Sequence, residues 1–318
     1  LAGKGASARQ ATLRAAIDWS WDLLEPWEKS AMAQLSAFEG GFTLEHAEQV
    51  VAIEDDWPDA PWVMDLVQAL VDKSLLRAWE PEGSDELRFG MYTSMQEYAA
   101  EKLRDPDAIP AGEEGQRDEL LEETLRRHLE CFAAYGDDEA RAELIGPDAI
   151  ERRAAVSREL ENLVAAAGRG DELDEPELAA RAALASADIF RVQGPLQAGV
   201  QVLEQASEDV DDEDLLAMLA LERGDLLRLS GETQEAAEAL EEAIEADDAV
   251  VQARAKVRLA LVRASQRKPD EANELLAAAL KNAKRARNKA LQAEALRGQG
   301  IVATDTGDAE LGLEKLRA

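Results

Sequence analysis

The chain has 318 residues and 46% of them are hydrophobic, which is enough for two or three structural units with ordinary cores. Its 67 acidic and 35 basic residues give a net charge of −32, a field that repels phosphate and argues against a general binder of nucleic acid or anionic membranes. One cysteine, two histidines and the lack of an apolar run of ~20 residues argue against a disulfide framework, a metal site and a membrane span. We therefore expect a soluble, cytoplasmic, mainly α-helical protein.

The composition changes along the chain. All six tryptophans lie in the first 80 residues, and Phe190 is the only aromatic residue after Tyr135. Proline and glycine interrupt the pattern between residues 105 and 115, which is typical of a linker. The predicted organisation is a tail over 1–12, a first domain over 13–104, a linker over 105–118, a helical bridge over 119–175 and helical repeats over 176–318.

The first domain begins with a predicted helix over residues 11–24, with Leu13, Ile17 and Leu24 on one face. Pro26 stands where a second helix begins, and Thr43 is placed to cap a short third one. A fourth helix over 62–73 has a buried stripe made of Val63, Leu66, Val67, Leu70 and Val71.

Two short apolar segments, 75–79 and 87–91, flank a polar turn through Gly83 and predict a β-hairpin. A further helix over 96–103 closes the domain. Several helices followed by a two-stranded wing are typical of a winged helix.

Segments 11–24, 38–45, 70–76 and 88–98 resemble, in order, the winged-helix domain that follows the nucleotide-binding core in bacterial STAND-class signalling ATPases. Segment 159–167 resembles the helix that leads into the tetratricopeptide array of the same proteins. The resemblance implies a molecular switch in which helical repeats sense a partner or inducer, while ATP or ADP binds an upstream core of the intact protein. That core is expected to lie ahead of this sequence.

No phosphate-binding loop is recognisable in this sequence. The nearest approach is Gly3-Lys4-Gly5, where glycine stands in place of the Ser or Thr that must follow the lysine, so we read it as a linker. Relatives often place a Met-His-Asp triplet after the wing, and Met91-Tyr92-Thr93 stands there in this chain. Two readings of Tyr92 stay open: a nucleotide contact in the intact protein, or a tyrosine packed in the domain core.

A DNA-reading helix needs basic or amide side chains and a basic flank. Residues 1–105 hold 9 Lys and Arg against 20 Asp and Glu, and the wing turn over 80–86 carries four acids and no base. We therefore expect this winged helix to pack against protein rather than DNA. Glu54-Asp55-Asp56, with Asp59, is read as a solvated acidic loop.

The bridge is predicted to contain one helix marked by five apolar residues and a second helix over 150–167. Cys131 should pack as a small apolar side chain. His128 and His46 lack the neighbours of a zinc site, and we expect both on helix surfaces. The five residues that mark the first helix are Leu120, Leu121, Leu125, Leu129 and Phe132.

Self-similarity begins after residue 176. Turn positions Gly194, Gly231, Arg267 and Gly307 are spaced by 37, 36 and 40 residues. Small residues recur seven positions before and five positions after each turn, and leucine recurs nine positions after it. This register predicts tetratricopeptide-like helix pairs, because only Gly or Ala lets two helix backbones approach closely. The fourth pair is incomplete, so we expect the natural protein to continue.

The net charge conceals a basic band. Residues 251–298 carry 12 basic and 4 acidic side chains, a balance of +8. We expect this band to bind a protein or peptide partner, which could be acidic. Two structural readings stay open: balancing of adjacent acidic repeats, and docking on an acidic surface of the parent chain. The predicted partner-binding residues are Arg254, Lys256, Arg258, Arg263, Arg267, Lys281, Arg285 and Arg287.

The sequence favours a non-catalytic sensor or scaffold portion of a STAND-type regulator, with no catalytic residues and no cofactor or metal of its own. The alternative is a DNA-binding transcriptional regulator that acts through its winged helix. An enzyme is the third class, and it is disfavoured because Asp and Glu occur in runs typical of solvated helix faces.

Overall fold

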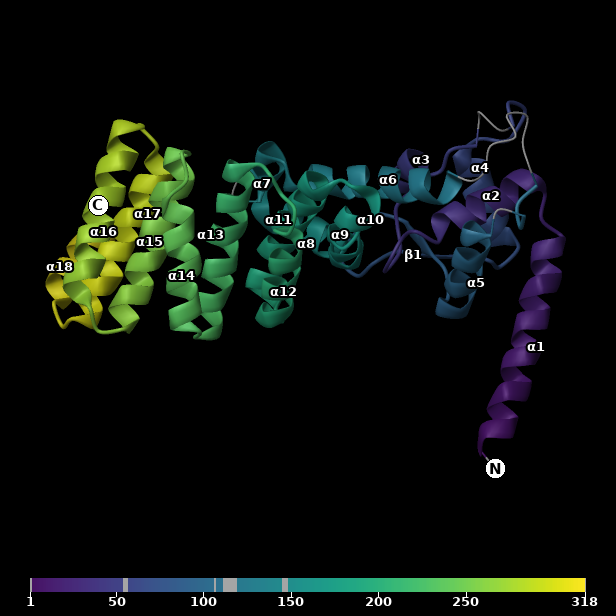
Figure 1. The fold of residues 1–318 in the computed structure, drawn as a ribbon, viewed down its shortest axis with the longest axis horizontal. Coiled ribbons are helices and arrows are strands. Elements are labelled where there is room, and N and C mark those ends of the chain that lie inside the picture. Colours follow the sequence, from purple (N-terminus) through teal and green to yellow (C-terminus); the bar gives the residue numbers. More distant parts are fainter. Residues whose placement is uncertain (1, 54–56, 106, 111–118, 145–147, 318) are drawn as a thin grey trace. The chain divides into compact units, whose positions relative to one another are not determined.

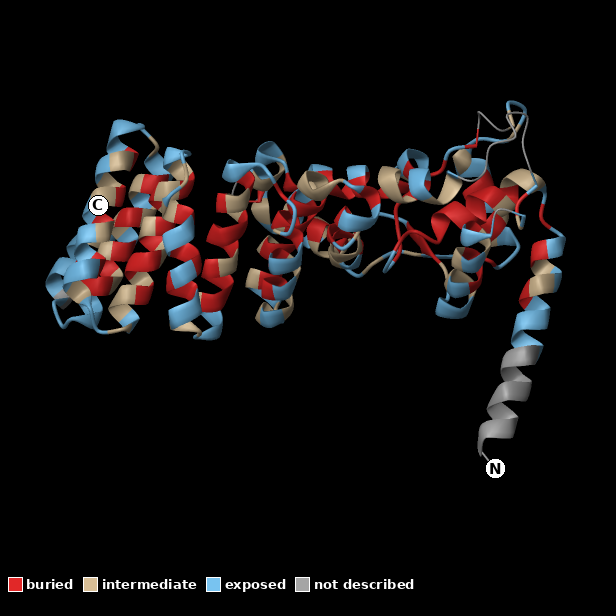
Figure 2. Ribbon diagram, in the orientation of Figure 1, coloured by how far each residue is buried: buried red, intermediate tan, exposed pale blue. Residues whose placement is uncertain are grey.

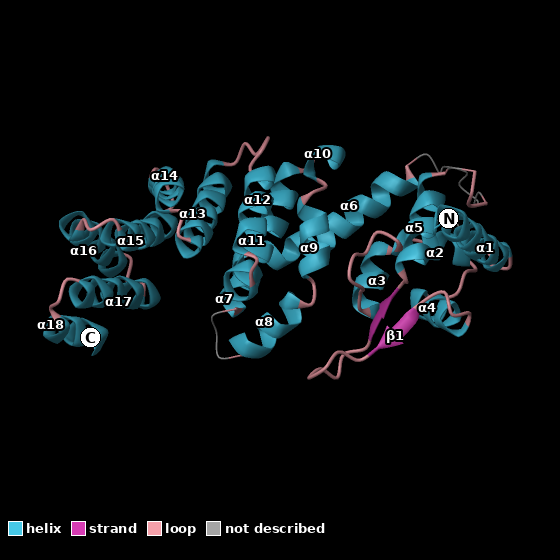
Figure 3. Cartoon of the chain, turned by 90° about the horizontal axis from the view of Figure 1, so that it is seen from below, coloured by secondary structure: helices cyan, strands magenta, loops and turns pink. Residues whose placement is uncertain are grey.

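The computed structural model describes residues 2–53, 57–105, 107–110, 119–144 and 148–317. The described residues form eighteen α-helices, one 3-10 helix and one two-stranded sheet, which confirms a mainly α protein (Figures 1 and 3). The acidic segment Glu54-Asp55-Asp56 and most of the expected linker lie outside the described residues. In the part described, no helix is both long and apolar enough to cross a membrane.

The chain divides into two compact units. The first contains residues 1–132 and 158–165, and the second contains residues 133–157 and 166–318. Each unit is described by itself below.

The first unit holds six helices and a hairpin before residue 132, and it includes most of α9. Helix α1 begins at Ala2, so the segment expected to be a tail is helical, and Leu13 is exposed rather than buried. The elements are α1 (Ala2–Asp22), α2 (Pro26–Leu35), α3 (Leu44–Val50), α4 (Val63–Asp72), β1 (Arg77–Trp79), β2 (Arg88–Gly90), α5 (Thr93–Arg104), α6 (Leu120–Ala133) and α9 (Leu160–Ala167).

Helices α2, α3 and α4 lie where the sequence predicted helices, and α2 and α3 begin at residues that favour a helix start. Pro26 occupies the first turn of α2, and the Glu25 backbone N–H donates to the Glu28 carboxylate at 2.9 Å in a capping box. Thr43 caps α3 by accepting from the His46 backbone N–H at 3.2 Å. On α4, Leu66, Val67 and Leu70 are buried, which confirms the centre of its apolar stripe.

The predicted hairpin is present with shorter strands. β1 and β2 pair antiparallel with Ala78 opposite Phe89, and the Phe42 backbone exchanges two hydrogen bonds of 2.8 Å with Phe89 on its other side. Phe38 stacks on Phe42 at 4.7 Å between ring centroids, which draws the hairpin into an aromatic core.

The second unit begins with η1 (Ala134–Gly136), α7 (Asp138–Glu143) and α8 (Ala149–Ser157), and continues after α9 with α10 (Gly170–Leu173). The prediction of one helix over 150–167 was wrong, because α8 ends at Ser157 and α9 begins at Leu160. Glu159, between them, turns its carboxylate into the first unit's core.

Four helix pairs follow, in the predicted order. Gly194, Gly231, Arg267 and Gly307 all adopt positive φ, between 61° and 93°, at the turn inside each pair. The repeat prediction is therefore confirmed at every turn. The first helices are α11 (Pro176–Gln193), α13 (Glu213–Ser230), α15 (Ala249–Ser265) and α17 (Lys289–Asp305), and the second helices are α12 (Leu196–Ala206), α14 (Thr233–Ile244), α16 (Pro269–Arg285) and α18 (Ala309–Arg317).

The small residues lie where helices of a pair cross. A Cβ on Gly224 of α13 would stand 2.6 Å from the Leu240 Cγ of α14, and one on Gly300 would stand 2.7 Å from the Leu316 Cγ. Ala187 and Ala260 occupy the same column fully buried, and Figure 2 shows buried residues running through the stacked helices. Close backbone approach thus explains the register that the sequence displays.

Candidate functional site

Seven charged side chains form a continuous cluster across α7, α11, α13 and α15 in the second unit. We call them the charge ladder. Each acid in it pairs with at least two arginines, and side-chain exposure in the cluster ranges from 4% to 28%. The members are Arg141, Asp188, Arg191, Glu222, Asp225, Arg228 and Arg258.

Asp225 is the most buried member and receives three arginines. Arg228, on the same helix, donates to its Oδ1 from Nε at 2.9 Å and from Nη2 at 2.7 Å. The Arg258 Nε lies 3.3 Å from Oδ1, and the Arg191 Nε lies 3.2 Å from Oδ2. A carboxylate shared by arginines from three first helices holds these helices together.

Glu222 and Asp188 are bridged by the same two arginines. Arg141 donates to the Glu222 Oε1 at 2.6 Å and to the Asp188 Oδ2 at 3.1 Å, and Arg191 donates to both acids. Burial alone would raise the pKa of Glu222, but the charges of Arg191 and Arg141 lower it to about 2. Glu222 is therefore ionised at neutral pH.

The sequence analysis missed this cluster, although the repeat register contained the signal. An Asp and an Arg stand six and three positions before the turn glycine in two successive repeats, as Asp188 and Arg191 before Gly194 and as Asp225 and Arg228 before Gly231. In α15 the same positions hold Leu261 and Ala264, so the ladder ends at Arg258.

The structure assigns part of the predicted basic band to contacts within the chain. Arg258 belongs to the ladder, and Arg263 pairs with Glu241 and with Glu271, the latter at 3.3 Å. Lys256 donates to the Gln252 side chain at 2.8 Å. Arg258 and Arg263, both on α15, therefore pair with acids of the preceding repeat, as one of the two structural readings expected.

The other predicted residues are separate from the ladder. Arg267, Lys281, Arg285 and Arg287 are exposed, Arg254 is half-buried, and none of the five makes an ion pair within the residues that the structure describes. Two of these five, Arg267 and Arg287, have positive φ in turns. The band thus contains a paired part on α15 and a part that is free for other contacts.

A second buried network lies in the first unit and joins three of the segments that carry the family resemblance. Arg88, on β2, donates through both terminal nitrogens to the Glu159 carboxylate, and both side chains are nearly inaccessible. Asn162 donates to the Gly41 carbonyl at 2.8 Å and accepts from the Glu39 backbone N–H at 2.7 Å. The hairpin, the Phe38–Phe42 segment and α9 therefore meet at one polar centre.

The expectations for the histidines were wrong. His128 is fully buried and His46 is 6% exposed, and both rings lie around Phe132 at 4.6 and 5.1 Å between centroids. Burial lowers the pKa of His46. Among the described residues no three His, Cys, Asp or Glu side chains could hold a metal together.

Cys131 is buried, as predicted, and burial raises the pKa of its thiol to about 12. Tyr92 is 63% exposed, so the reading of a tyrosine packed in the core was wrong. Its ring lies 5.8 Å from the guanidinium of Arg77.

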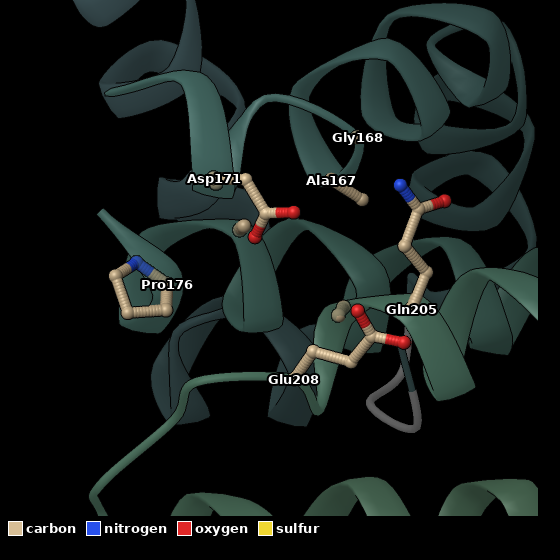
Figure 4. A pocket seen from close by; sticks show the side chains of 9 residues that line it. Ala167, Gly168, Asp171, Pro176, Gln205 and Glu208 are labelled. Carbon is tan, nitrogen blue, oxygen red and sulfur yellow. The ribbon is translucent and has the colours of Figure 1, made fainter. Parts of the chain in front are cut away.

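The second unit also contains a small open hollow where α10, α11 and α12 approach. Figure 4 shows Asp171, Gln205 and Glu208 around it. Its lining holds two acids and no base, and Gly170 is explained by packing, because a Cβ there would lie 2.8 Å from the Ala179 methyl.

Comparisons with known proteins give partial matches. Residues 224–318 match the family model of the suppressor of spindle checkpoint defect 1 C-terminal domain. HTH-type transcriptional regulators of Mycobacterium tuberculosis and Mycobacterium bovis are 41% identical over 102 residues, which is 32% of this chain and 11% of theirs.

A solved structure of a STAND protein with a tetratricopeptide repeat sensor, from Pyrococcus horikoshii, is 14% identical with a TM-score of 0.36. The match covers 93% of this chain and 50% of that protein. The chain therefore spans about half of this structure and about a tenth of the mycobacterial regulators.

Proposed function

We propose that this chain is the winged-helix and tetratricopeptide-repeat portion of a STAND-type signalling regulator. In this proposal the repeats bind a protein partner or inducer, the winged helix packs against an upstream ATPase core, and the portion has no catalysis of its own. ATP or ADP would bind that core, with Tyr92 as a contact from the wing side.

One observation carries the proposal: four helix pairs in register present a long surface whose basic side chains are only partly used within the chain. Stacked repeats are stabilised by their neighbours and leave extended faces for partners. The buried polar centre of Arg88, Glu159 and Asn162 supports the winged-helix part, because the hairpin meets the helix that leads into the repeats.

The proposal is tested by co-purification from source cells with the full chain as bait, quantified by mass spectrometry. We expect a defined protein to be retained by the unaltered chain and lost when Arg254, Arg267 and Lys281 are changed to Glu. A matched control changes Arg104, Arg153 and Arg317 to Glu, which alters the net charge equally outside the predicted residues. Retention that is equal in all three baits contradicts the proposal, as does ATP hydrolysis by the purified chain.

The names of the mycobacterial relatives favour a second candidate, a DNA-binding regulator that acts through the winged helix. The exposed side chains of α4 include Asp65, Gln68 and Asp72, and the hairpin turn is acidic, so the surface lacks the positive charge that phosphate contacts require. A gel-shift with random duplex DNA at low salt decides between the two, and a shifted band at low micromolar protein favours this candidate.

A further inference from the structure

Three turns on the same edge of the repeat array differ in charge. Each joins the second helix of one pair to the first helix of the next: 207–212 between α12 and α13, 245–248 between α14 and α15, and 286–288 between α16 and α17 (Figure 1). Hydrogen bonds place the last two side by side, because Gln252 donates to the Ile244 carbonyl at 3.1 Å and accepts from Asn282 at 3.4 Å.

The first two turns are acidic and the third is basic. Exposed acids surround the first two turns, whereas five exposed cations stand within nine residues at the third. We call these five the basic corner. The acids are Glu208, Asp209, Asp211, Asp212 and Glu213 at the first turn and Glu245, Asp247 and Asp248 at the second, and the basic corner is Lys281, Lys284, Arg285, Arg287 and Lys289.

The helix caps change with the charge. Asp212 and Asp248 cap α13 and α15 by accepting from backbone N–H groups at 2.6 to 3.0 Å, and α17 is capped by the neutral Asn288, which accepts from the Leu291 N–H at 3.0 Å. Asn and Asp are about equally good caps. The neutral cap therefore keeps the helix start intact and leaves the basic corner without an adjacent carboxylate of its own turn.

Helix stability accounts for only part of this cluster. Lys284 and Arg285 stand in the last turn of α16, where the helix dipole favours cations, but Lys289 stands at the first residue of α17, where the dipole disfavours them. Arg287 adopts a positive φ of 54°, a conformation that is strained for an arginine. None of the five makes an ion pair within the described ranges, although the chain as a whole has almost twice as many acids as bases.

We propose that the basic corner binds a short acidic protein segment, a role that rests on the proposed partner-binding function and locates it on this edge of the array. A cluster of unpaired cations within an acidic chain selects a compact anion by local charge complementarity. The flanking acids at 245–248 repel a long polyanion, so a short run of carboxylates fits better than a nucleic-acid backbone.

The test uses a fluorescein-labelled deca-glutamate peptide and the purified full chain, with binding followed by fluorescence anisotropy at low salt. We expect the unaltered chain to bind the peptide, and the triple variant Lys284→Glu, Arg285→Glu, Arg287→Glu to bind about tenfold more weakly or worse. The control triple Arg104→Glu, Arg153→Glu, Arg317→Glu carries the same net charge and should retain the affinity within about twofold. Far-UV circular dichroism checks folding, and Lys284→Gln, Arg285→Gln, Arg287→Gln replaces the first variant if that one unfolds.

Three outcomes overturn the inference: no peptide binding by the unaltered chain, equal loss in the corner and control variants, or tighter binding of a duplex DNA of equal charge. The proposed function fails differently. If the co-purified partner is lost with Arg254→Glu, Arg267→Glu, two residues outside the basic corner, but persists in the corner variant, the repeats still bind a protein and only this location is wrong.

Discussion

Both units bury charged side chains, but they do so in different ways. In the first unit Arg88 and Glu159 are 71 residues apart and meet beside the backbone carbonyls of Gly41 and Arg158. In the second unit the ladder joins partners about one repeat apart, such as Arg191 with Glu222 and Asp225 with Arg258. In stacked repeats, contacting residues are separated along the chain by about one repeat length, so the same spacing recurs. In a single domain core the spacing differs from one contact to the next.

The comparison is tested most severely by Arg88→Ala, which leaves the Glu159 carboxylate buried without its partner. Removing one member of a buried pair typically costs about 3–5 kcal/mol, so we expect a loss of that size in the first unit. All six tryptophans lie in this unit, and their fluorescence during denaturant unfolding measures the change. The control, Arg14→Ala, breaks the exposed ion pair with Glu101 and should have little effect. Equal denaturant midpoints for the two variants would show that the buried Arg88–Glu159 pair does not stabilise the first unit.

In the second unit the corresponding test is acid titration of Glu222. Its pKa is about 2 in the folded protein against an ordinary value of 4.5, so the folded state binds this proton more weakly than the unfolded state. The stabilisation is complete above about pH 5 and is lost as pH falls towards 2, and it is on the order of 3 kcal/mol.

We expect Glu222→Gln to be less stable than the unaltered chain at neutral pH and the difference to shrink on acidification. Far-UV circular dichroism reports the helices of both units and tryptophan fluorescence reports the first unit alone, so a helical transition without a fluorescence change belongs to the second unit. If the difference in stability between the two proteins stays constant from pH 6 to about pH 3, protonation of Glu222 does not cause the pH dependence of stability.

Gly224→Ala tests the close packing on which the register rests. In an exposed helix this change stabilises, because alanine is the better helix former. Here the added methyl would lie 2.6 Å from the Leu240 Cγ, so we expect a net loss of about 1–2 kcal/mol by denaturant unfolding. The double variant Gly224→Ala, Leu240→Ala should be less destabilised than the sum of the single changes. Additive losses would mean that the two residues do not share one contact.

The same contrast explains what the sequence could predict. The turns at Gly194, Gly231, Arg267 and Gly307 were predictable, because each repeat imposes the same backbone requirement and the columns reinforce one another. The break between α8 and α9 was not, since Glu159 leaves the helical pattern for an ion pair with Arg88.

The candidate site divides in a similar way. His128 was expected on a helix surface because the sequence around it lacks the arrangement of a zinc site. Phe132 lies one turn away on the same helix, and only the tertiary fold brings Phe38 against the His128 ring. The ladder was within reach of sequence reasoning, as the repeated Asp and Arg before two turns show, but their pairing with Glu222 and Arg141 depends on how neighbouring helices stack.

The smallest expected effect connects helix capping to the basic corner. Asn288→Asp gives α17 the same carboxylate cap as its two predecessors, so unfolding measurements should show stability raised by a few tenths of a kcal/mol. The new charge lies beside Arg287 and Lys289, and the affinity for deca-glutamate should fall about two- to threefold. Asp248→Asn is the matched control, because it makes the reverse change in the neighbouring turn. It should lower stability slightly without weakening the binding of deca-glutamate. If both variants change stability but neither changes affinity, the caps serve the helices alone, and the neutral cap of α17 has no part in peptide binding.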